Sequence, residues 1–493
     1  MLRFSITILF IILTYTCLVG QVLRDTTFRT IDSASYADYT TRDWSKVIEV
    51  GKLAKKNEID YFYLRMRLGI ANYNLGYYNN SASNFEKALK FNNADQVAQL
   101  YLYDSYLVTG KTSKALKLSA KFNDNTKSLL PDNIKVLEKV YAGGGYLSSN
   151  NFNNNSNYQL GRNNDTLNGN KVLIGSKINA YLGLQVNVSP TFSFYFGYNH
   201  LSIEKRVAFQ FREVSLRLDS TINFPWGYQN YFSVDTAFKQ QIFDEKIYQN
   251  EVYLNSKLQF EDGWSISAFG NLVIVNSVDF VPELNQNTIT DTLWYVNNTG
   301  PELFTFDYTE TSFIKQNKTF VDYVVGLSLE KDINSAIFNI FGSYSSLNEL
   351  KQYQLGLSST YFLNKAATFY GTTGLIWFSE SLQNNNRENR LIFDQKAGAK
   401  LAGRLWGEAS IVVGNLNNAN TDHGLIVYNQ ADNMKFKGAL KLRVFISDHF
   451  ELNLSYSYVA YEGNFIEFEP SVDNTYTYEY QSQNLIGGIV WSL

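Results

Sequence analysis

The sequence predicts an α+β protein of two parts, a short array of paired α-helices followed by a membrane-spanning antiparallel β-barrel of about 14 strands. Three observations support this prediction. Residues recur with a period of 34 between positions 30 and 126, polar and apolar residues alternate over long runs after Pro131, and the connections between these runs are alternately short and long. A chain of 493 residues also exceeds one ordinary core, so more than one domain is expected.

The N-terminal segment 1–20 has the features of a secretory signal peptide. Arg3 precedes an almost wholly apolar run, Phe4 to Val19, and cleavage is expected after Gly20. A retained membrane anchor and a lipoprotein cut before Cys17 are the alternatives. Because Cys17 is the only cysteine, structural disulfides and cysteine-based metal sites are excluded. Residues 21–29 are expected to form a linker.

The overall composition narrows the class of protein. The net charge of −3 offers no basic excess for binding nucleic acid. Aromatic residues make up 16% of the chain, a fraction that suits a barrel with aromatic belts facing a membrane. A membrane protein is therefore favoured over a nucleic-acid-binding one.

The repeat period predicts stacked helix pairs over residues 30–126. Gly76 and Gly110 keep this spacing, as do Ala37 and Ala71. The middle unit, Phe62 to Asp95, resembles a tetratricopeptide repeat. The positions that carry the resemblance are Leu68, Gly69, Tyr73, Leu75, Gly76, Tyr78, Ser81, Phe85, Ala88 and Leu89. Ser81 stands where the family usually has alanine, and Asn93 where it usually has proline. Three repeats are expected.

The resemblance implies a scaffold that binds a protein partner, either a periplasmic or an outer-membrane protein. In such repeats the first helix of each pair lines a concave groove. The residues that this placement turns into the groove are Tyr63, Met66, Ile70, Asn74, Asp104 and Val108. The alternative is that the helices form only a spacer or pack against their own barrel.

Residues 138–493, which follow a linker at 127–137, alternate as β-strands do. From Met434 to Phe445 the lysines and Arg443 share one face, and bulky apolar residues fill most of the other. Such runs are 11 to 15 residues long, whereas an ordinary strand has about 5 to 6 residues. A tilted membrane strand needs about 9 to 11. No later stretch approaches 18 consecutive apolar residues, so any span after the first segment must consist of strands.

The connections are typical of a bacterial outer-membrane barrel, in which short turns face the periplasm and long loops face outward. Short turns are expected at Ser189-Pro190, Glu261 to Gly263, Lys331 to Asn334, Leu363 to Lys365, Gly403-Arg404 and Ser447-Asp448. Long loops are expected at Asn150 to Asn170, Lys205 to Lys246, Asp279 to Lys318, Ser379 to Arg390, Asn415 to Asn433 and Gly463 to Thr475. One outer connection, at Asn348-Glu349, is short. An even number of strands places the helices and the C-terminus together in the periplasm.

Fourteen strands are expected, and aromatic residues mark their periplasmic ends. The strand centres are Gly145, Ala180, Phe196, Leu254, Phe269, Val325, Ile340, Leu357, Gly371, Gly398, Ile411, Leu440, Leu454 and Ile486. The expected girdle consists of Phe192, Phe260, Trp264, Trp406, Phe450 and Trp491. The last residues, Gly488 to Leu493, resemble the closing strand of outer-membrane proteins. Leu493 replaces the usual phenylalanine there.

Alternation turns a set of charged side chains into the barrel lumen. These are Lys257, Lys396, Lys400, Lys437, Lys441, Arg443, Glu330, Glu408 and Glu451. Two interpretations stay open: a basic wall that favours anionic solutes, or cross-strand ion pairs that hold the barrel rigid. The bore is expected to be open or closed by an inward-folded loop, for which Lys205 to Lys246 is the best candidate.

No residue pattern matches a catalytic or metal site, so neither an enzyme nor a cofactor is predicted. His200, His423 and His449 are expected to be solvated surface residues. The first hypothesis for function is an outer-membrane protein whose periplasmic repeats bind a partner in envelope assembly or export. The alternative is a pore for small, possibly anionic solutes with the repeats as an accessory.

Overall fold

The computed structural model shows two compact units, one helical and one a β-barrel, which are described separately. The described residues are 27–109, 111–130, 136–153, 168–189, 191–225, 227–260, 263–294, 301–333, 336–363, 368–382, 386–430, 432–468 and 473–493. The expected signal peptide, Cys17 and most of the first linker lie outside these residues. No helix among the described residues is long and apolar enough to cross a membrane.

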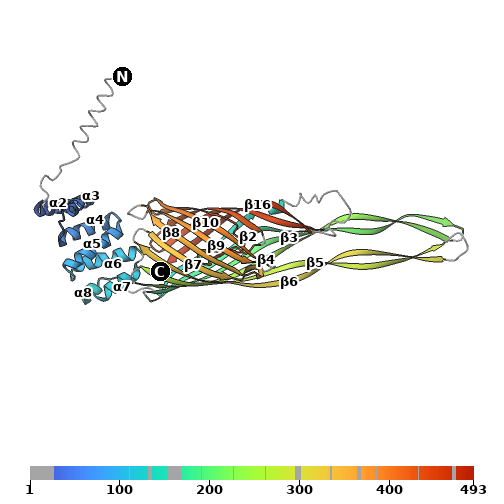
Figure 1. Ribbon diagram of the computed structural model, residues 1–493, viewed down its shortest axis with the longest axis horizontal. Coiled ribbons are helices and arrows are strands. Elements are labelled where there is room, and N and C mark those ends of the chain that lie inside the picture. Colours follow the sequence, from blue (N-terminus) through green and yellow to red (C-terminus); the bar gives the residue numbers. More distant parts are fainter. Residues whose placement is uncertain are drawn as a thin grey trace, which may run out of the picture. The chain divides into compact units, whose positions relative to one another are not determined.

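The helical unit consists of antiparallel helix pairs (Figure 1). Its helices are α2 (Phe28–Thr40), α3 (Trp44–Lys56), α4 (Phe62–Asn74), α5 (Tyr78–Phe91), α6 (Gln96–Val108), α7 (Thr112–Ala120) and α8 (Asp124–Lys127). The first helices of the pairs begin at residues 28, 62 and 96, and the second helices begin at 44, 78 and 112. Each series therefore repeats with the period that the sequence shows. The array begins at Phe28, slightly ahead of its expected start.

Side-chain caps fix where several of these helices start. Thr27 and Thr30 form a reciprocal capping box at the start of α2. Asp43 accepts a hydrogen bond from the amide of Lys46 at 3.3 Å, and Asp95 does the same for Ala98 at 2.8 Å. Each cap satisfies an amide that has no partner within the helix, so the caps hold the repeat boundaries in register.

The helices pack around two apolar clusters. One contains Ile31, Val47 and Leu64, and the other is centred on Phe85. Gly69 of α4 makes room for the second cluster, because a Cβ at this position would lie 2.7 Å from the Phe85 ring. Small residues at the helix crossings therefore allow the close approach that the repeat period predicts.

The second unit is a closed antiparallel barrel of 14 strands (Figure 1). Around the barrel its strands are β1 (Leu137–Ser149), β2 (Asn168–Ser189), β3 (Phe192–Phe224), β4 (Gly227–Gln259), β5 (Trp264–Trp294), β6 (Pro301–Ile333), β7 (Ala336–Ser345), β8 (Gln352–Phe362), β9 (Phe369–Ser381), β10 (Arg387–Ala402), β11 (Leu405–Val413), β14 (Asn433–Phe445), β15 (Phe450–Phe468) and β16 (Asp473–Ser492). The prediction of about 14 strands is confirmed, and every expected centre lies within its strand. Pairing of β1 with β16 closes the ring.

The outer wall of the barrel is apolar. Leu440 and Leu442 of β14 point outward and are 59% and 41% exposed, while Arg443 beside them points inward to Glu451. Trp264, Phe450 and Trp491 also face outward, as expected for a girdle, and the last two rings stack 6.1 Å apart.

Trp406 differs from the prediction of a lipid-facing girdle. It shares its strand face with Glu408, which accepts a hydrogen bond from Tyr370 on the lumen side. It also lies in register with Arg443, another lumen residue. Trp406 therefore faces inward.

Strands replace three of the expected loops, two of them as long hairpins and one, Gly463 to Thr475, as the paired ends of β15 and β16 over its described residues. β3 pairs with β4, and β5 with β6, far beyond the point where the other strands end (Figure 1). The described parts of Lys205 to Lys246 and of Asp279 to Lys318 are therefore strands, contrary to the prediction. They contain enough aromatic and β-branched residues to remain paired.

The short outer connection at Asn348-Glu349 is confirmed as a single turn of 3-10 helix, η2 (Leu347–Glu349). Asn348 and Glu349 both adopt left-handed backbone angles, with φ of 53° and 63°. Leu347 is fully buried. The turn thus joins β7 to β8 in few residues and anchors the connection through one apolar side chain.

Candidate functional site

The connection between β11 and β14 turns into the barrel, and we call its described residues, 414–430 and 432, the plug loop. The chain leaves β11 at Gly414, whose φ of 131° is one that side-chain-bearing residues rarely adopt. Within the loop, β12 (Asn420–Thr421) pairs with β13 (Ile426–Val427) as a small ladder. Its tip contains Asp422 and His423 in left-handed conformations, with φ of 49° and 57°.

Apolar side chains of the plug loop pack against the inner wall. Leu416 and Ala419 are fully buried, and Tyr428 is nearly so. They belong to one apolar cluster with wall residues from β4 through β16. The cluster also contains Tyr253, Phe269, Phe341, Phe378, Ile392, Met434, Val459, Tyr461 and Tyr480. The plug loop therefore packs apolar side chains against the wall inside the barrel.

Asparagine side chains of the plug loop bind polar groups of the wall. The Gln354 side chain of β8 accepts bonds from the Asn420 backbone amide at 2.8 Å and from the Asn420 side-chain amide at 2.6 Å, and donates to the Asn420 carbonyl at 3.0 Å. Asn418 donates to Glu380 of β9 at 2.5 Å and accepts from Asn348 at 2.6 Å. Apart from Asn348 these residues are buried, so each bond satisfies an otherwise costly buried polar group.

The tip of the plug loop lies deep in the lumen. The His423 ring lies 5.8 Å from that of Phe269 and 5.7 Å from that of Phe341. Its Nε2 atom is 3.4 Å from Oδ1 of Asn339, which lies near the short-turn end of β7. Asp422 forms an ion pair of 2.8 Å with Lys396 of β10. The loop thus enters at the outer end of the barrel and reaches toward the opposite end.

Two sequence predictions about this region are wrong. The segment expected to close the lumen, Lys205 to Lys246, belongs to the hairpin of β3 and β4, and the plug loop takes that place. His423, expected on the solvated surface, is half-buried between two phenylalanine rings of the wall. His200 and His449 lie nearer the surface, where they bind Asn250 and the Ser492 carbonyl respectively.

Most of the charged residues predicted for the lumen lie beside partners of opposite charge or a hydroxyl. Lys257 binds Glu330 at 2.9 Å, and Arg443 binds Glu451 through two bonds of 2.7 and 3.0 Å. Lys396 forms an ion pair with Asp422, and Lys437 donates a hydrogen bond to the Tyr428 hydroxyl. Glu408 accepts a hydrogen bond from Tyr370 and lies in register with Lys441. Lys400 is exposed and lies in register with Trp406. The lumen therefore carries both signs of charge close together.

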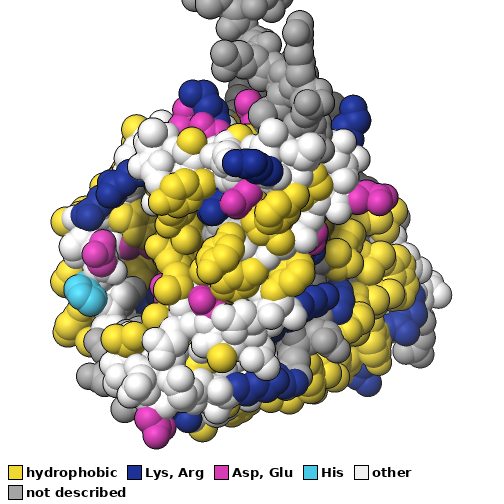
Figure 2. Space-filling view, turned by 90° about the vertical axis from the view of Figure 1, so that its left-hand side faces the viewer, with side chains coloured by type: hydrophobic (Ala, Val, Ile, Leu, Met, Phe, Trp, Pro, Cys, Tyr) yellow, Lys and Arg dark blue, Asp and Glu magenta, His cyan; other side chains and the backbone are white. Residues whose placement is uncertain are grey.

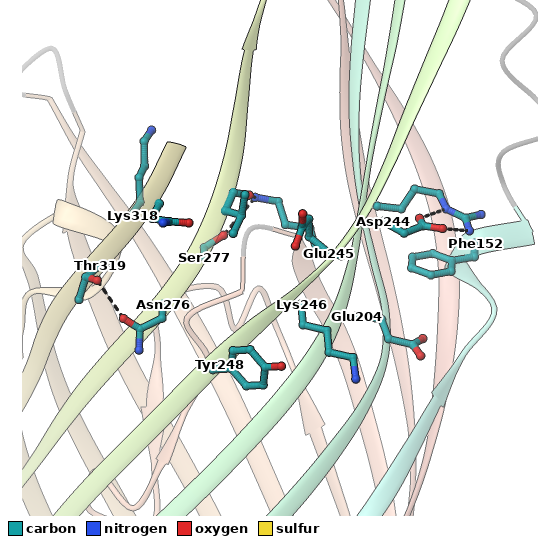
Figure 3. Close-up of a pocket in the computed structure, with 14 residues that line it drawn as sticks. Phe152, Glu204, Asp244, Glu245, Lys246, Tyr248, Asn276, Ser277, Lys318 and Thr319 are labelled. Carbon is teal, nitrogen blue, oxygen red and sulfur yellow. Dashed lines mark hydrogen bonds and ion pairs between the residues drawn. The ribbon is translucent and has the colours of Figure 1, made fainter. Parts of the chain in front are cut away.

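A cavity of about 810 Å³ lies where the two long hairpins separate (Figure 3). The ladder between β4 and β5 ends at the pair Tyr248 and Asn276, which we call the last rung. Beyond it β4 pairs only with β3, and β5 pairs only with β6. Above the rung the Lys205 ammonium crosses to β5 and donates to the Ser277 hydroxyl, the Val278 carbonyl and Asp279, at 3.1, 2.8 and 2.5 Å. The cavity walls thus carry many charged groups near the outer mouth of the barrel.

Five phenylalanines join the two hairpins above this cavity. The Phe243 and Phe280 rings stack 3.9 Å apart, and Phe313 packs against Phe209, Phe211 and Phe243. An ion pair of 2.6 Å between a lysine of β6 and a glutamate of β4, Lys315 and Glu245, adds to this contact. Side chains, without a backbone ladder, therefore connect β4 to β5 at this level.

The residues predicted to line a groove of the helical unit differ in exposure. Tyr63, Val108 and Asn74 are exposed. Met66 and Ile70 instead pack against the cluster around Phe85, so they contribute to the helix core as well. Asp104 is half-buried, and its burial raises the pKa of its carboxyl group. The six residues therefore do not form one uniformly open surface.

An ion pair joins the first helices of two successive pairs. Arg67 of α4 donates to Asp32 of α2 at 2.7 Å, and Tyr61 donates to the same carboxyl at 2.9 Å. The hydrogen bond from Arg67 lowers the pKa of Asp32, more than burial raises it. This ion pair therefore adds to the apolar contacts that hold α2 against α4.

Replacing Asp32 with Asn should remove a pH-dependent part of the stability of the helical unit. An aspartate with a lowered folded pKa stabilises the fold above its unfolded pKa of about 3.9, and this contribution is lost as the pH falls through the folded value. Because the Asp32 side chain is 39% exposed, a loss below about 1 kcal/mol is expected at pH 7. Hydrogen exchange of α2 and α4 at pH 7 and pH 3 measures it. A variant that matches the wild type at pH 7 would contradict the prediction.

The residues that the sequence analysis missed are the asparagines of the plug loop. The asparagine content of Asn415 to Asn433 predicts an outer loop, whereas the structure turns this segment inward. A second property of the segment could have revealed this. It also holds the apolar residues Leu416, Ile426, Val427 and Tyr428, which a solvated loop has no need of. Within the described ranges, no cluster of three or more His, Cys, Asp or Glu residues is placed to hold a metal ion.

No protein family matches the sequence, and no curated protein does. Among solved structures, the chain is similar to the toluene transporter TodX of Pseudomonas putida, with 10% identity and a TM-score of 0.37, over 75% of this chain and 92% of that one. A FadL homologue of Pseudomonas aeruginosa gives 7% identity and a TM-score of 0.39, over 76% and 93%. A mutant of MamA gives 22% identity and a TM-score of 0.19, over 22% and 62%. At these identities and scores, no function carries over to this chain from the similar structures.

Proposed function

We propose that this protein is an outer-membrane barrel that lets small polar solutes pass when the plug loop leaves the lumen. The observation that carries the proposal is the attachment of the plug loop to the wall through Asn418, Asn420 and the tip residue Asp422. Water can replace such polar contacts at a modest cost, whereas a core filled by wall side chains alone cannot open. The lumen is therefore closed by a removable segment.

The outer wall supports a location in a bilayer. Its leucines, isoleucines and valines are too exposed for a surface in water, and contiguous apolar belts of this kind are covered by lipid or protein. A closed ring of strands leaves no unpaired edge inside the bilayer. Flotation of the reconstituted protein with liposomes tests this location, and recovery without detergent in the soluble fraction would contradict it.

The charges in the lumen bear on which solutes pass. The prediction of an anionic solute rests on the basic residues alone, yet Lys257, Lys396 and Arg443 each bind a carboxylate. Because these three basic groups each lie close to an acidic one, we expect only a weak preference between cations and anions. Small polar solutes of either sign are therefore included in the proposal.

Replacing Gln354 with Leu should raise the frequency of channel openings. The change removes three hydrogen bonds to Asn420 and leaves its polar groups buried without partners on β8. A loss of roughly 1 to 3 kcal/mol in plug binding corresponds to a rise of about 5- to 150-fold in the open population. Single-channel recording in planar bilayers measures it. Gln316→Leu, on the exposed hairpin strand β6, is the matched control, and equal opening by both variants would contradict the role of the plug loop.

A second candidate function is the binding of a protein partner by the helical unit. It is favoured by the regular recurrence of helix starts, which resembles a tetratricopeptide array, and by exposed apolar side chains. These are Phe28, Tyr36, Tyr63, Phe91, Val97 and Val108. Figure 2 shows hydrophobic side chains gathered among charged ones on the face it presents. Photocrosslinking from Tyr63 in cells tests this function, and crosslinks only within the chain would count against it.

A further inference from the structure

A single row of outward-facing residues crosses five neighbouring strands near the short-turn end of the barrel. The register places Trp264 of β5 beside Lys331 of β6, then Phe338 of β7, Ser359 of β8 and Thr373 of β9. The Lys331 ammonium lies 4.7 Å from the centre of the Trp264 ring. The row therefore combines an interfacial tryptophan, a cation and two hydroxyl groups.

The next outward row, toward the middle of the barrel, is wholly apolar. It consists of Ile266, Leu329, Ile340, Leu357 and Leu375, one from each of the same strands. Between the two rows lies a groove of about 560 Å³. The small side chains of Ser359 and Thr373 deepen it where their neighbours in the sheet are bulky. The groove thus has a polar end at the rim and an apolar floor that leads away from it.

We propose that this groove binds a glycerophospholipid of the membrane leaflet that faces the short turns. The phosphate would lie on Lys331 and the Ser359 hydroxyl, at the depth that Trp264 marks as the interface, and one acyl chain would follow the leucine and isoleucine row. A phospholipid has an anionic headgroup followed by hydrocarbon chains. This sequence matches the groove, in which the polar row lies at the rim and the apolar row lies toward the middle of the barrel. The inference rests on the proposed location of the barrel in a membrane, but not on the proposed opening of the plug loop.

The test is native mass spectrometry of the full-length protein in detergent. The protein is titrated with dipalmitoyl phosphatidylglycerol, and the fraction that keeps a lipid after release from the detergent is measured. One lipid should remain bound at low excess. Lys331→Gln should lower the retained fraction by about tenfold, since it removes a charged hydrogen-bond donor, and Lys331→Arg should restore it. Ser359→Phe should also abolish retention, because a ring would fill the groove. Arg404→Gln, which removes a cation from the turn between β10 and β11, is the matched control and should retain lipid normally.

A lipid without a phosphate group tests whether Lys331 recognises the headgroup. A dipalmitoyl glycerol without phosphate should bind wild-type protein as weakly as the phospholipid binds Lys331→Gln. Equal retention of the two lipids, or equal retention by wild type and Lys331→Gln, would overturn the proposal. If Ser359→Phe does not form a barrel, the two Lys331 variants still decide. A protein that fails to float with liposomes would contradict the membrane location itself, whereas one that floats but shows no lipid preference would contradict only this site.

Discussion

Replacing residues 415–431 with a short glycine-serine linker is expected to turn the protein into a steadily conducting pore. The plug loop contributes Leu416, Ala419 and Tyr428 to the packing inside the lumen, and many of the wall residues that face it are amides and hydroxyl groups. Without the loop these groups would contact water, and a ring of 14 strands lies between filled barrels of 8 strands and open porins of 16 to 18. The strands themselves keep their pairing.

Swelling of liposomes in a small neutral sugar measures this effect, and the rate should rise on the order of tenfold over the wild type. A variant that shortens the hairpin of β5 and β6 by removing residues 284–309 is the control, because that hairpin extends beyond the barrel wall and should leave the rate unchanged. If the linker variant forms a heat-stable barrel and still excludes the sugar, the plug loop is not what closes the lumen.

Replacing Phe85 with Ala is expected to destabilise the helical unit by about 3 to 5 kcal/mol. The Phe85 side chain is fully buried, and its ring stacks on Tyr101 with centroids 5.3 Å apart. It also fills the space that Gly69 leaves open on the facing helix. One side chain thus joins α4, α5 and α6, so its loss leaves a cavity that no single neighbour can fill.

Hydrogen exchange across α4 to α6 in the full-length protein measures this loss, because it reports on the amides of these helices individually. Phe91→Ala lies in the same helix, where Phe91 is 54% exposed, and should cost about 0.5 kcal/mol or less. Equal protection in the two variants would show that Phe85 is not central to the packing of the repeats.

The strands of the barrel were predictable because apolar and polar residues alternate regularly along them. Every second residue of a membrane strand must be apolar, which makes runs such as Met434 to Phe445 recognisable without any knowledge of the fold. The outer halves of β3 to β6 lack this regular alternation, so their sequences resemble loops although their backbones are paired.

The lumen charges were predictable from the same alternation, whereas the plug loop was not. Lys257 and Arg443 lie on regular strands, so counting along the strand gives their direction. The positions of Asn418 and Asn420 depend instead on contacts with β8 and β9, which lie far earlier in the chain. For Trp406 the two sequence signals disagree. Its position directly after a turn predicted the lipid interface, but it lies two residues from Glu408 on the same face of β11, and that face points into the lumen.

Below Tyr248 and Asn276, backbone hydrogen bonds set the distance between β4 and β5. Above this level, at the seam between the two hairpins, both strands continue without pairing to each other. Here an ammonium, an ion pair and a group of stacked rings set the distance, through Lys205, Lys315 and Phe243. The width of the mouth at this seam therefore depends on side chains, whereas the barrel beneath it is held by backbone hydrogen bonds.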